Sequence, residues 1–288
     1  MSLLLRLCLI PFSLCFGCLL PAVPSSESIR KEIKDVYQAI VRIEVVSEQG
    51  SGGRMMKSRS TGSGVIISKN GLVLTNHHVA GKASRLTCRL SDGEEVMADL
   101  LGADAMTDLA LLRLRLDERD PKATPIKTAD FGNSDKVNVG DMCFAMGSPA
   151  GLSQSVTKGI ISNTALISAS SRSFRLDGEN VGELVRWLGH DAVIYPGNSG
   201  GPLVDKNGKI IGINEVGIGS LGGAIPSNLA KNVAQELEKQ GYVSRSWVGL
   251  ECQPMIEENL SGVLVAGVIS DSPADLSEIK AGDIITKY

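Results

Sequence analysis

The sequence Gly197-Asn198-Ser199-Gly200-Gly201-Pro202-Leu203 sets one serine among glycines, between the apolar runs 192–195 and 203–204. This pattern is typical of a nucleophile on a tight loop at the edge of a β-sheet. Glycine allows positive φ and the close approach of a substrate. The N–H groups of Gly197 and Ser199 can therefore converge on one point, as an oxyanion hole requires. A glycine-rich hairpin turn with an ordinary serine also fits, and the motif alone does not decide between them.

Two upstream segments supply the other groups that a serine nucleophile needs. The apolar run 72–76 ends in His77 and His78, and Asp108 directly precedes a second apolar run, 109–112. A serine hydroxyl is a weak nucleophile until a base takes its proton, and the base needs a carboxylate to fix its tautomer. The order along the chain is histidine, aspartate, serine, which predicts a catalytic triad.

These three contexts resemble the trypsin-like serine peptidases, and specifically the HtrA/Deg family, from about Val36 to the C-terminus. That family shows T-N-x-H-V, then T-D-[IL]-A-L, then P-G-N-S-G-G-P-L. The resemblance implies an all-β fold with two six-stranded antiparallel β-barrels of the chymotrypsin/trypsin type. It also implies an ATP-independent serine endopeptidase that cleaves unfolded or misfolded proteins in extracytoplasmic quality control. Homotrimers are implied as well, with Tyr37 as the obvious aromatic candidate near the N-terminus.

The resemblance assigns a role to each triad residue. His78 aligns with the family's base, and His77 falls at the variable position before it. Because consecutive side chains of an extended segment face opposite ways, both histidines cannot reach Ser199. Asp108 is expected to hold the Nδ1–H of His78, although a turn or helix N-cap aspartate would also fit its local sequence. His190 is expected to be a surface or loop residue.

The oxyanion hole is expected to use the backbone amides of Gly197, Asn198 and Ser199. Specificity is expected from residues 190–196 and 213–226. The second segment is rich in Gly, Ile, Val and Leu and has no aspartate to attract a basic P1 residue. We therefore expect small to medium aliphatic P1 residues. Glu215 is the one charge in that wall, and its side chain is not placed by the sequence.

Short apolar runs separated by turn residues predict an all-β barrel architecture. We expect a helix over 27–39, a strand over 39–46 and an exposed, mobile loop over 47–63. Further strands, in hairpins, are expected over 64–68, 72–75, 86–90 and 95–101. Barrel one extends to about residue 125, and barrel two begins at about 126. A closing helix over 228–239 ends at Gly241, so the protease domain covers 26–240.

Composition bounds the class of protein. The chain has 288 residues and a formal net charge of −3, so a nucleic-acid partner is not favoured. Residues 1–25 read as a secretory signal peptide, because one basic residue precedes an apolar run too short for a membrane span. We expect a secreted or periplasmic protein without a stable membrane span after cleavage near Ser25. Phe16-Gly17-Cys18 faintly resembles a lipoprotein box, and lipid anchoring is the less favoured alternative.

Cysteine and histidine usage gives no metal pattern. After removal of the signal peptide Cys88, Cys143 and Cys252 remain, without Cys-x-x-Cys spacing. Cys88 and Cys143 are expected to be buried apolar residues, and one disulfide among the three stays open. With 3 histidines and no clustered carboxylates we expect no metal and no cofactor.

The C-terminal part, 246–288, resembles the opening of a PDZ domain. Trp247, Val248, Gly249 and Leu250 resemble its carboxylate-binding loop, and the second wall of the peptide groove would lie beyond Tyr288. A second hypothesis for the whole chain is a resting or chaperone-like peptide-binding scaffold with an inactive protease. A third is a truncated gene product that folds poorly.

Overall fold

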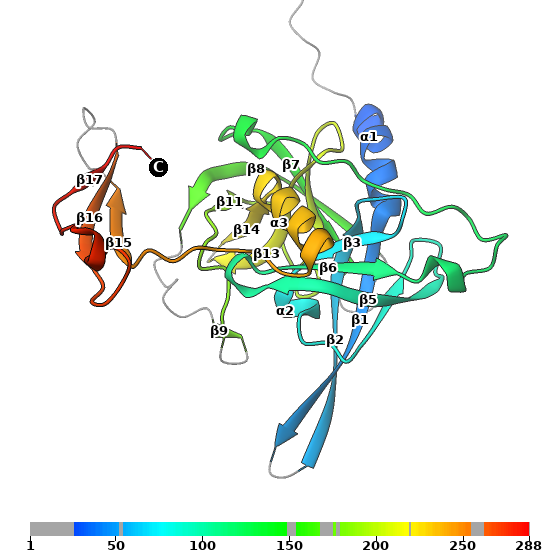
Figure 1. The fold of residues 1–288 in the computed structure, drawn as a ribbon. Coiled ribbons are helices and arrows are strands. Elements are labelled where there is room, and N and C mark those ends of the chain that lie inside the picture. Colours follow the sequence, from blue (N-terminus) through cyan, green and yellow to red (C-terminus); the bar gives the residue numbers. More distant parts are fainter. Residues whose placement is uncertain are drawn as a thin grey trace, which may run out of the picture.

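The computed structural model describes residues 26–51, 54–148, 154–167, 175–176, 179–218, 220–254 and 262–287. The expected signal peptide, 1–25, lies outside these residues. Figure 1 shows two β-barrels side by side, helix α3 lying against them, and a small C-terminal sheet at one side. No helix in the described ranges is both long enough and apolar enough to span a membrane.

Barrel one is a closed antiparallel sheet with the strand order β1-β2-β3-β6-β5-β4. Apolar residues alternate with polar ones along a strand that has one buried face, and run continuously along a strand that has both faces buried. Five of the six positions of β6 are buried. Helix α1 (Ser26–Ala39) precedes the barrel, and the short helix α2 (His77–Ala80) follows its third strand. The strands are β1 (Ile40–Ser51), β2 (Arg54–Ile66), β3 (Leu72–Thr75), β4 (Arg85–Arg89), β5 (Glu95–Asp104) and β6 (Leu109–Leu114).

Barrel two is also closed and antiparallel, in the order β11-β14-β13-β12-β7-β8. Its strands are β7 (Met142–Gly147), β8 (Ser155–Leu166), β11 (Trp187–His190), β12 (Pro202–Asp205), β13 (Ile210–Ile218) and β14 (Leu221–Pro226). A separate pair, β9 (Arg175–Leu176) and β10 (Glu179–Asn180), lies between β8 and β11 in the chain. These two closed six-stranded barrels confirm the fold class predicted from the sequence.

Helix α3 (Ser227–Gln240) closes the structure where the sequence predicted a helix. Its buried stripe includes Val233 and Leu237, and each such side chain contributes about 1.5–3 kcal/mol when removed from water. Gly241 ends the helix at φ +81°, with its N–H donating to the Leu237 carbonyl at 3.0 Å. Buried residues of α3, of barrel one and of part of barrel two form one apolar cluster, so the two barrels are packed against each other. A second, smaller cluster lies within barrel two.

The predicted loop 47–63 is instead a long β-hairpin, and that prediction was wrong. β1 and β2 pair without interruption from Ile40↔Val65 to Ser51↔Arg54. The hairpin extends beyond the barrel in Figure 1. Residues 54–61 are exposed, so the outer half of β2 carries no alternation of apolar and polar residues by which a strand is recognised. Backbone pairing, with one exposed ion pair between Lys57 and Glu48, gives this half its strand conformation.

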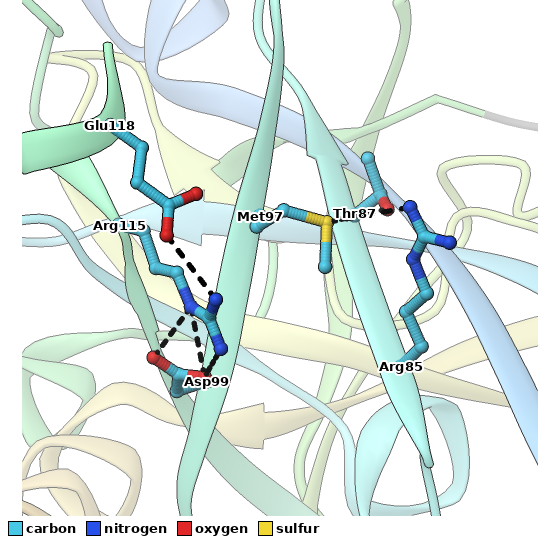
Figure 2. Close-up of polar contacts among 6 residues, drawn as sticks. All are labelled: Arg85, Thr87, Met97, Asp99, Arg115 and Glu118. Carbon is cyan, nitrogen blue, oxygen red and sulfur yellow. Dashed lines mark hydrogen bonds and ion pairs between the residues drawn. The ribbon is translucent and has the colours of Figure 1, made fainter.

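The outer face of barrel one carries polar contacts between neighbouring strands (Figure 2). Arg115 Nη2 lies 2.7 Å from Asp99 Oδ1, and Arg115 Nη1 lies 3.3 Å from Glu118 Oε1. Arg85 and Thr87 on β4 both contact the sulfur of Met97 on β5. Exposed ion pairs contribute at most about 1 kcal/mol, so the buried core and not this face holds the barrel together.

The C-terminal sheet has the order β15-β16-β17, with β15 (Leu250–Pro254), β16 (Val263–Val268) and β17 (Ile284–Ile285). Figure 1 shows it beside the barrels, at the end of the segment that follows α3. Val265 and Ala274 are buried in it, whereas Trp247 is 62% exposed. Its assignment as a partial PDZ domain stays a prediction.

Candidate active site

His78 lies on the one-turn helix α2, immediately after β3. Its ring Nδ1 is 2.7 Å from Asp108 Oδ2, and its backbone N–H donates to Asp108 Oδ1 at 2.9 Å. The Asp108 backbone carbonyl accepts from the His77 N–H and from Asn76 Nδ2, both at 3.0 Å. This double anchoring of side chain and backbone fixes the His78 ring relative to the carboxylate.

Asp108 is fully buried and has a left-handed backbone conformation, with φ 53°. Aspartate tolerates this region better than most residues. The short 3-10 helix Ala105–Thr107 leads into it, and Asp104 caps that helix by accepting from the Thr107 N–H. The sequence therefore makes a tight turn between β5 and β6 that presents the Asp108 carboxylate to α2.

The adjacent histidines have different surroundings. The segment is helical, not extended as the argument from the sequence assumed, but neighbouring side chains on a helix still diverge by about 100°. The His78 ring contacts Asp108, whereas the His77 ring lies over Gly81, where an added Cβ would be 2.2 Å from His77 Nδ1. The structure thus joins His78, and not His77, to the buried carboxylate.

Ser199 comes from the other barrel, on the loop between β11 and β12. Its carbonyl accepts from the Ser63 N–H of β2 at 2.9 Å, which ties this loop to barrel one. Gly200 follows at φ +84°, and a Cβ there would lie 2.1 Å from the Ser63 carbonyl oxygen. Only glycine therefore lets the serine loop approach β2 this closely.

The Ser199 hydroxyl donates to the backbone carbonyl of Glu215 at 3.1 Å. No hydrogen bond joins it to His78 among the contacts of the described residues. The three expected triad residues thus lie on loops that the Ser63–Ser199 bond brings together, with His78 and Asp108 already bonded. In the structure the serine hydroxyl is bonded to the Glu215 carbonyl and not to His78.

The predicted oxyanion donors differ in their contacts. Gly197 has φ +102°, the left-handed conformation expected for the tight turn. The Asn198 N–H donates to the Tyr195 carbonyl at 2.9 Å, so it is already engaged. The amides of Gly197 and Ser199 make no such bond to a described residue. Of the three expected donors, these two are the ones left to bind an oxyanion.

Ser63 is a buried residue of this site that the sequence did not reveal. Its Oγ donates to the Gly197 carbonyl at 2.5 Å and accepts from the Ser148 N–H at 2.8 Å. It therefore connects β2, the end of β7 and the turn before Ser199. Ser63 lay in the predicted mobile loop, and a lone serine in a Gly/Ser-rich stretch gives no signal of burial.

Glu215, which the sequence left unplaced, points into the protein from β13. It is 4% exposed, and Trp187 Nε1 donates to its Oε2. Burial raises the pKa of Glu215 well above its ordinary value, and the negative charge of Asp108 raises it further. The signal in the sequence was a single charge within the apolar strand Ile210–Ile218.

His190 was expected at the surface, and that expectation was wrong. It is fully buried on β11, where it pairs with Gly222 of β14. Burial lowers the pKa of His190 to about 4, although contacts with Ala192, Asp191 and Asn214 oppose the shift. A histidine in a short strand between loops resembles an exposed one in sequence, because only the closed barrel covers it.

The predicted carboxylate-binding loop, 247–250, leads into the first strand of the C-terminal sheet and is far from Ser199 in the sequence. Val248 is 42% exposed, and the Gly249 carbonyl accepts from the Ile269 N–H at 2.9 Å. Leu250 begins β15. Peptide binding here stays a prediction.

The described residues contain no group of three or more His, Cys, Asp or Glu side chains arranged to hold a metal ion. Cys88 and Cys143 are buried and Cys252 is exposed, each as a free thiol in the structure. Burial raises the pKa of the Cys88 thiol to about 12, which disfavours the reactive thiolate, so this cysteine packs as a small apolar residue.

Two antiparallel barrels with a histidine–aspartate pair on one and a glycine-flanked serine on the other define the trypsin-like peptidases. The trypsin-like peptidase domain matches residues 62–213, and the chain belongs to this family. Among its relatives are proteins named probable periplasmic serine endoprotease DegP-like. The one from Pseudomonas fulva is 37% identical over 278 residues, which cover 92% of this chain and 54% of the relative. The one from Rickettsia conorii is 39% identical over 250 residues, 81% of this chain and 46% of the relative.

Solved structures give the same result. The HtrA-type protease AlgW with tripeptide matches at a TM-score of 0.69 and 34% identity, covering 91% of this chain and 82% of that one. The serine endoprotease from Yersinia pestis matches at a TM-score of 0.63 and 30% identity, covering 91% of this chain and 81% of that one. The HtrA/Deg resemblance is thereby confirmed. The chain spans about half the length of the curated relatives it matches.

Proposed function

We propose that the chain is a serine endopeptidase of the HtrA/DegP type that acts on unfolded polypeptides. The observation that carries the proposal is the His78–Asp108 pair, 2.7 Å between Nδ1 and Oδ2, on the barrel that also binds the Ser199 loop. His78 acts as general base toward the Ser199 hydroxyl, and Asp108 fixes the tautomer and stabilises the imidazolium. The amides of Gly197 and Ser199 bind the oxyanion.

Substrate and location follow from the relatives and the pocket walls. The relatives are named periplasmic endoproteases, which supports an extracytoplasmic site of action. The strands β13 and β14 lie near the serine loop and consist mostly of glycine and aliphatic residues, apart from Asn214 and Glu215 on β13. We infer a preference for aliphatic P1 residues, a role in protein quality control and a homotrimeric assembly.

A resting state of the same enzyme is the second candidate. The bond from Ser199 Oγ to the Glu215 carbonyl favours it, because in that rotamer the hydroxyl is not aimed at His78. An active state requires the Ser199 hydroxyl to leave the Glu215 carbonyl and to bond to His78 instead, so the resting state needs an activating signal.

A fluorophosphonate probe tests both candidates, because it reacts only with an activated serine. An active protease labels in the purified chain, and Ser199→Ala abolishes the label. A resting protease labels only after heating or addition of an unfolded polypeptide. If the folded protein never labels under any of these conditions, the proposed function is wrong.

A further inference from the structure

Glu215 occupies an unusual place for a carboxyl group. It lies on β13 beside the serine loop, with its own backbone carbonyl accepting from Ser199 Oγ. Trp187 of β11 donates to Oε2. Oε1 lies over Gly182, where an added Cβ would be 2.7 Å away and would clash. Both carboxyl oxygens are therefore enclosed, by an indole N–H and by a glycine that has no side chain.

The surroundings of Glu215 disfavour a negative charge. The side chain is 4% exposed, and the Asp108 carboxylate is a close neighbour with a charge of the same sign. His78 is bound to Asp108, while Trp187 and Gly182, from the other neighbouring elements, are uncharged. Two buried carboxylates side by side are costly, so one of them keeps a proton. Asp108 already accepts two hydrogen bonds from His78, one at each carboxylate oxygen, so we assign the proton to Glu215.

The proton can be assigned to one oxygen of Glu215. Oε2 is occupied as the acceptor of the Trp187 N–H. Oε1 makes no hydrogen bond of standard geometry with a described residue, although a buried polar atom normally has a partner. A proton on Oε1 would give the Asp108 carboxylate a third donor beside the two from His78.

We propose that Glu215 is a positioning residue for Asp108: a neutral carboxylic acid whose Oε1–H donates to the Asp108 carboxylate. The inference rests on the proposed function, because Asp108 matters only if His78 serves as a base. Glu215 thereby links the wall of the serine loop on barrel two to the carboxylate on barrel one. It acts on the reaction through Asp108 and does not touch the substrate.

Replacing Glu215 by glutamine distinguishes a neutral carboxylic acid at this position from a charged carboxylate. In Glu215→Gln the amide oxygen can accept from Trp187 and the amide NH₂ can donate to Asp108, so both contacts of a neutral acid are reproduced. Glu215→Met fills a similar volume but cannot donate. Neither change alters the backbone carbonyl that accepts from Ser199. Glu238→Gln on α3 removes an exposed carboxylate elsewhere and is the matched control.

The experiment measures the rate of fluorophosphonate labelling and the kcat and KM for casein, with circular dichroism to verify folding. We expect Glu215→Met to lower the labelling rate and kcat roughly 10- to 100-fold with little change in KM, since a hydrogen bond to a charged group is lost. Glu215→Gln should recover most of that loss, and Glu238→Gln should match the wild type. A folded Glu215→Gln as slow as Glu215→Met overturns the proposal, as does a Glu215→Met with wild-type rates.

Infrared spectroscopy supplies an independent readout of the protonation state. At neutral pH the wild type should show the C=O band of a buried neutral carboxylic acid, and this band should be absent from Glu215→Gln. A wild-type spectrum without such a band overturns the proposal. The proposed function fails separately: in that case the wild type itself does not label, or labels equally well after Ser199→Ala.

Discussion

Arg245 and Asp104 form a two-armed ion pair, with Nη1–Oδ1 at 2.5 Å and Nη2–Oδ2 at 2.6 Å. Arg245 lies in the segment after α3, and Asp104 caps the 3-10 turn that leads into Asp108. Burial alone would raise the pKa of Asp104, but the hydrogen bonds from Arg245 and Thr107 outweigh it and hold the pKa below its ordinary value. The segment leading to the C-terminal sheet is thus fastened to the turn that presents Asp108.

Loss of this ion pair should destabilise the protein. Arg245→Ala leaves the buried Asp104 carboxylate without its cation, and we expect the free energy of unfolding to fall by about 1–3 kcal/mol. Urea denaturation followed by fluorescence measures this. Arg115→Ala, which breaks two exposed ion pairs on barrel one, is the control and should cost less stability, because solvent screens exposed pairs. Equal effects of the two substitutions would contradict a special role for Arg245.

Acid should weaken the same contact. Because the pKa of Asp104 is lowered in the folded state, its contribution is present above the ordinary aspartate value and is lost as pH falls through the folded pKa. The difference in stability between wild type and Asp104→Asn should therefore shrink as pH falls below about 4. Thermal unfolding of both proteins at several pH values measures this, and a constant difference would argue against it.

The triad residues should be indispensable for cleavage. Ser199→Ala and His78→Ala should each lower the rate of casein cleavage roughly 10⁴-fold or more. His77→Ala should keep most of the activity, because His77 does not contact Asp108 through its ring. If His77→Ala were inactive and His78→Ala active, both being folded, the assignment of the base would be off by one residue.

Ser63 should matter more than other serines of its strand. Ser63→Ala removes the bond to the Gly197 carbonyl and the bond from the Ser148 N–H, so we expect a loss of about 1–3 kcal/mol of stability. Activity should fall as well, because the Gly197 amide is one of the two proposed oxyanion donors. Ser58→Ala, on the exposed part of β2, is the control. Thermal unfolding and fluorophosphonate labelling of both variants distinguish the two positions, and matching behaviour would refute the bridging role.

Buried His190 should make stability depend on pH. Its folded pKa of about 4 lies below that of an exposed histidine, so the unfolded chain binds the proton first. Stability from this group is therefore complete above about pH 6.5 and falls toward pH 4 by roughly 3 kcal/mol. His190→Asn should lose this part of the pH dependence. The difference between the two proteins isolates His190 from Glu215, whose raised pKa acts in the opposite direction.

The sequence predicted the parts of the site that come with a pattern. His78 and Asp108 lie beside apolar runs that become β3 and β6, and Ser199 is set among glycines that its tight loop requires. Ser63 and His190 have no such pattern. Their burial comes from pairing between segments far apart in the chain, and a single sequence does not record which segments meet.

Glu215 shows the same limit of sequence-based prediction, in a residue that the sequence did single out. A charge within an apolar strand was visible, but its role depends on Trp187, Gly182 and Asp108, which come from three other elements. The β1–β2 hairpin was missed because a strand exposed on both faces has no apolar alternation. Sequence patterns therefore predicted the type of an element where one of its faces is buried, and failed where both faces are exposed.

The division of the site between the barrels also sets an order in time. The ribosome synthesises a chain from the N-terminus onward, and domains generally fold as units, the N-terminal one first. The histidine and aspartate of barrel one precede the serine in the chain, and the Ser63–Ser199 bond can form only once the second barrel is present. A serine peptidase built this way has no complete cutting site while it is still half synthesised.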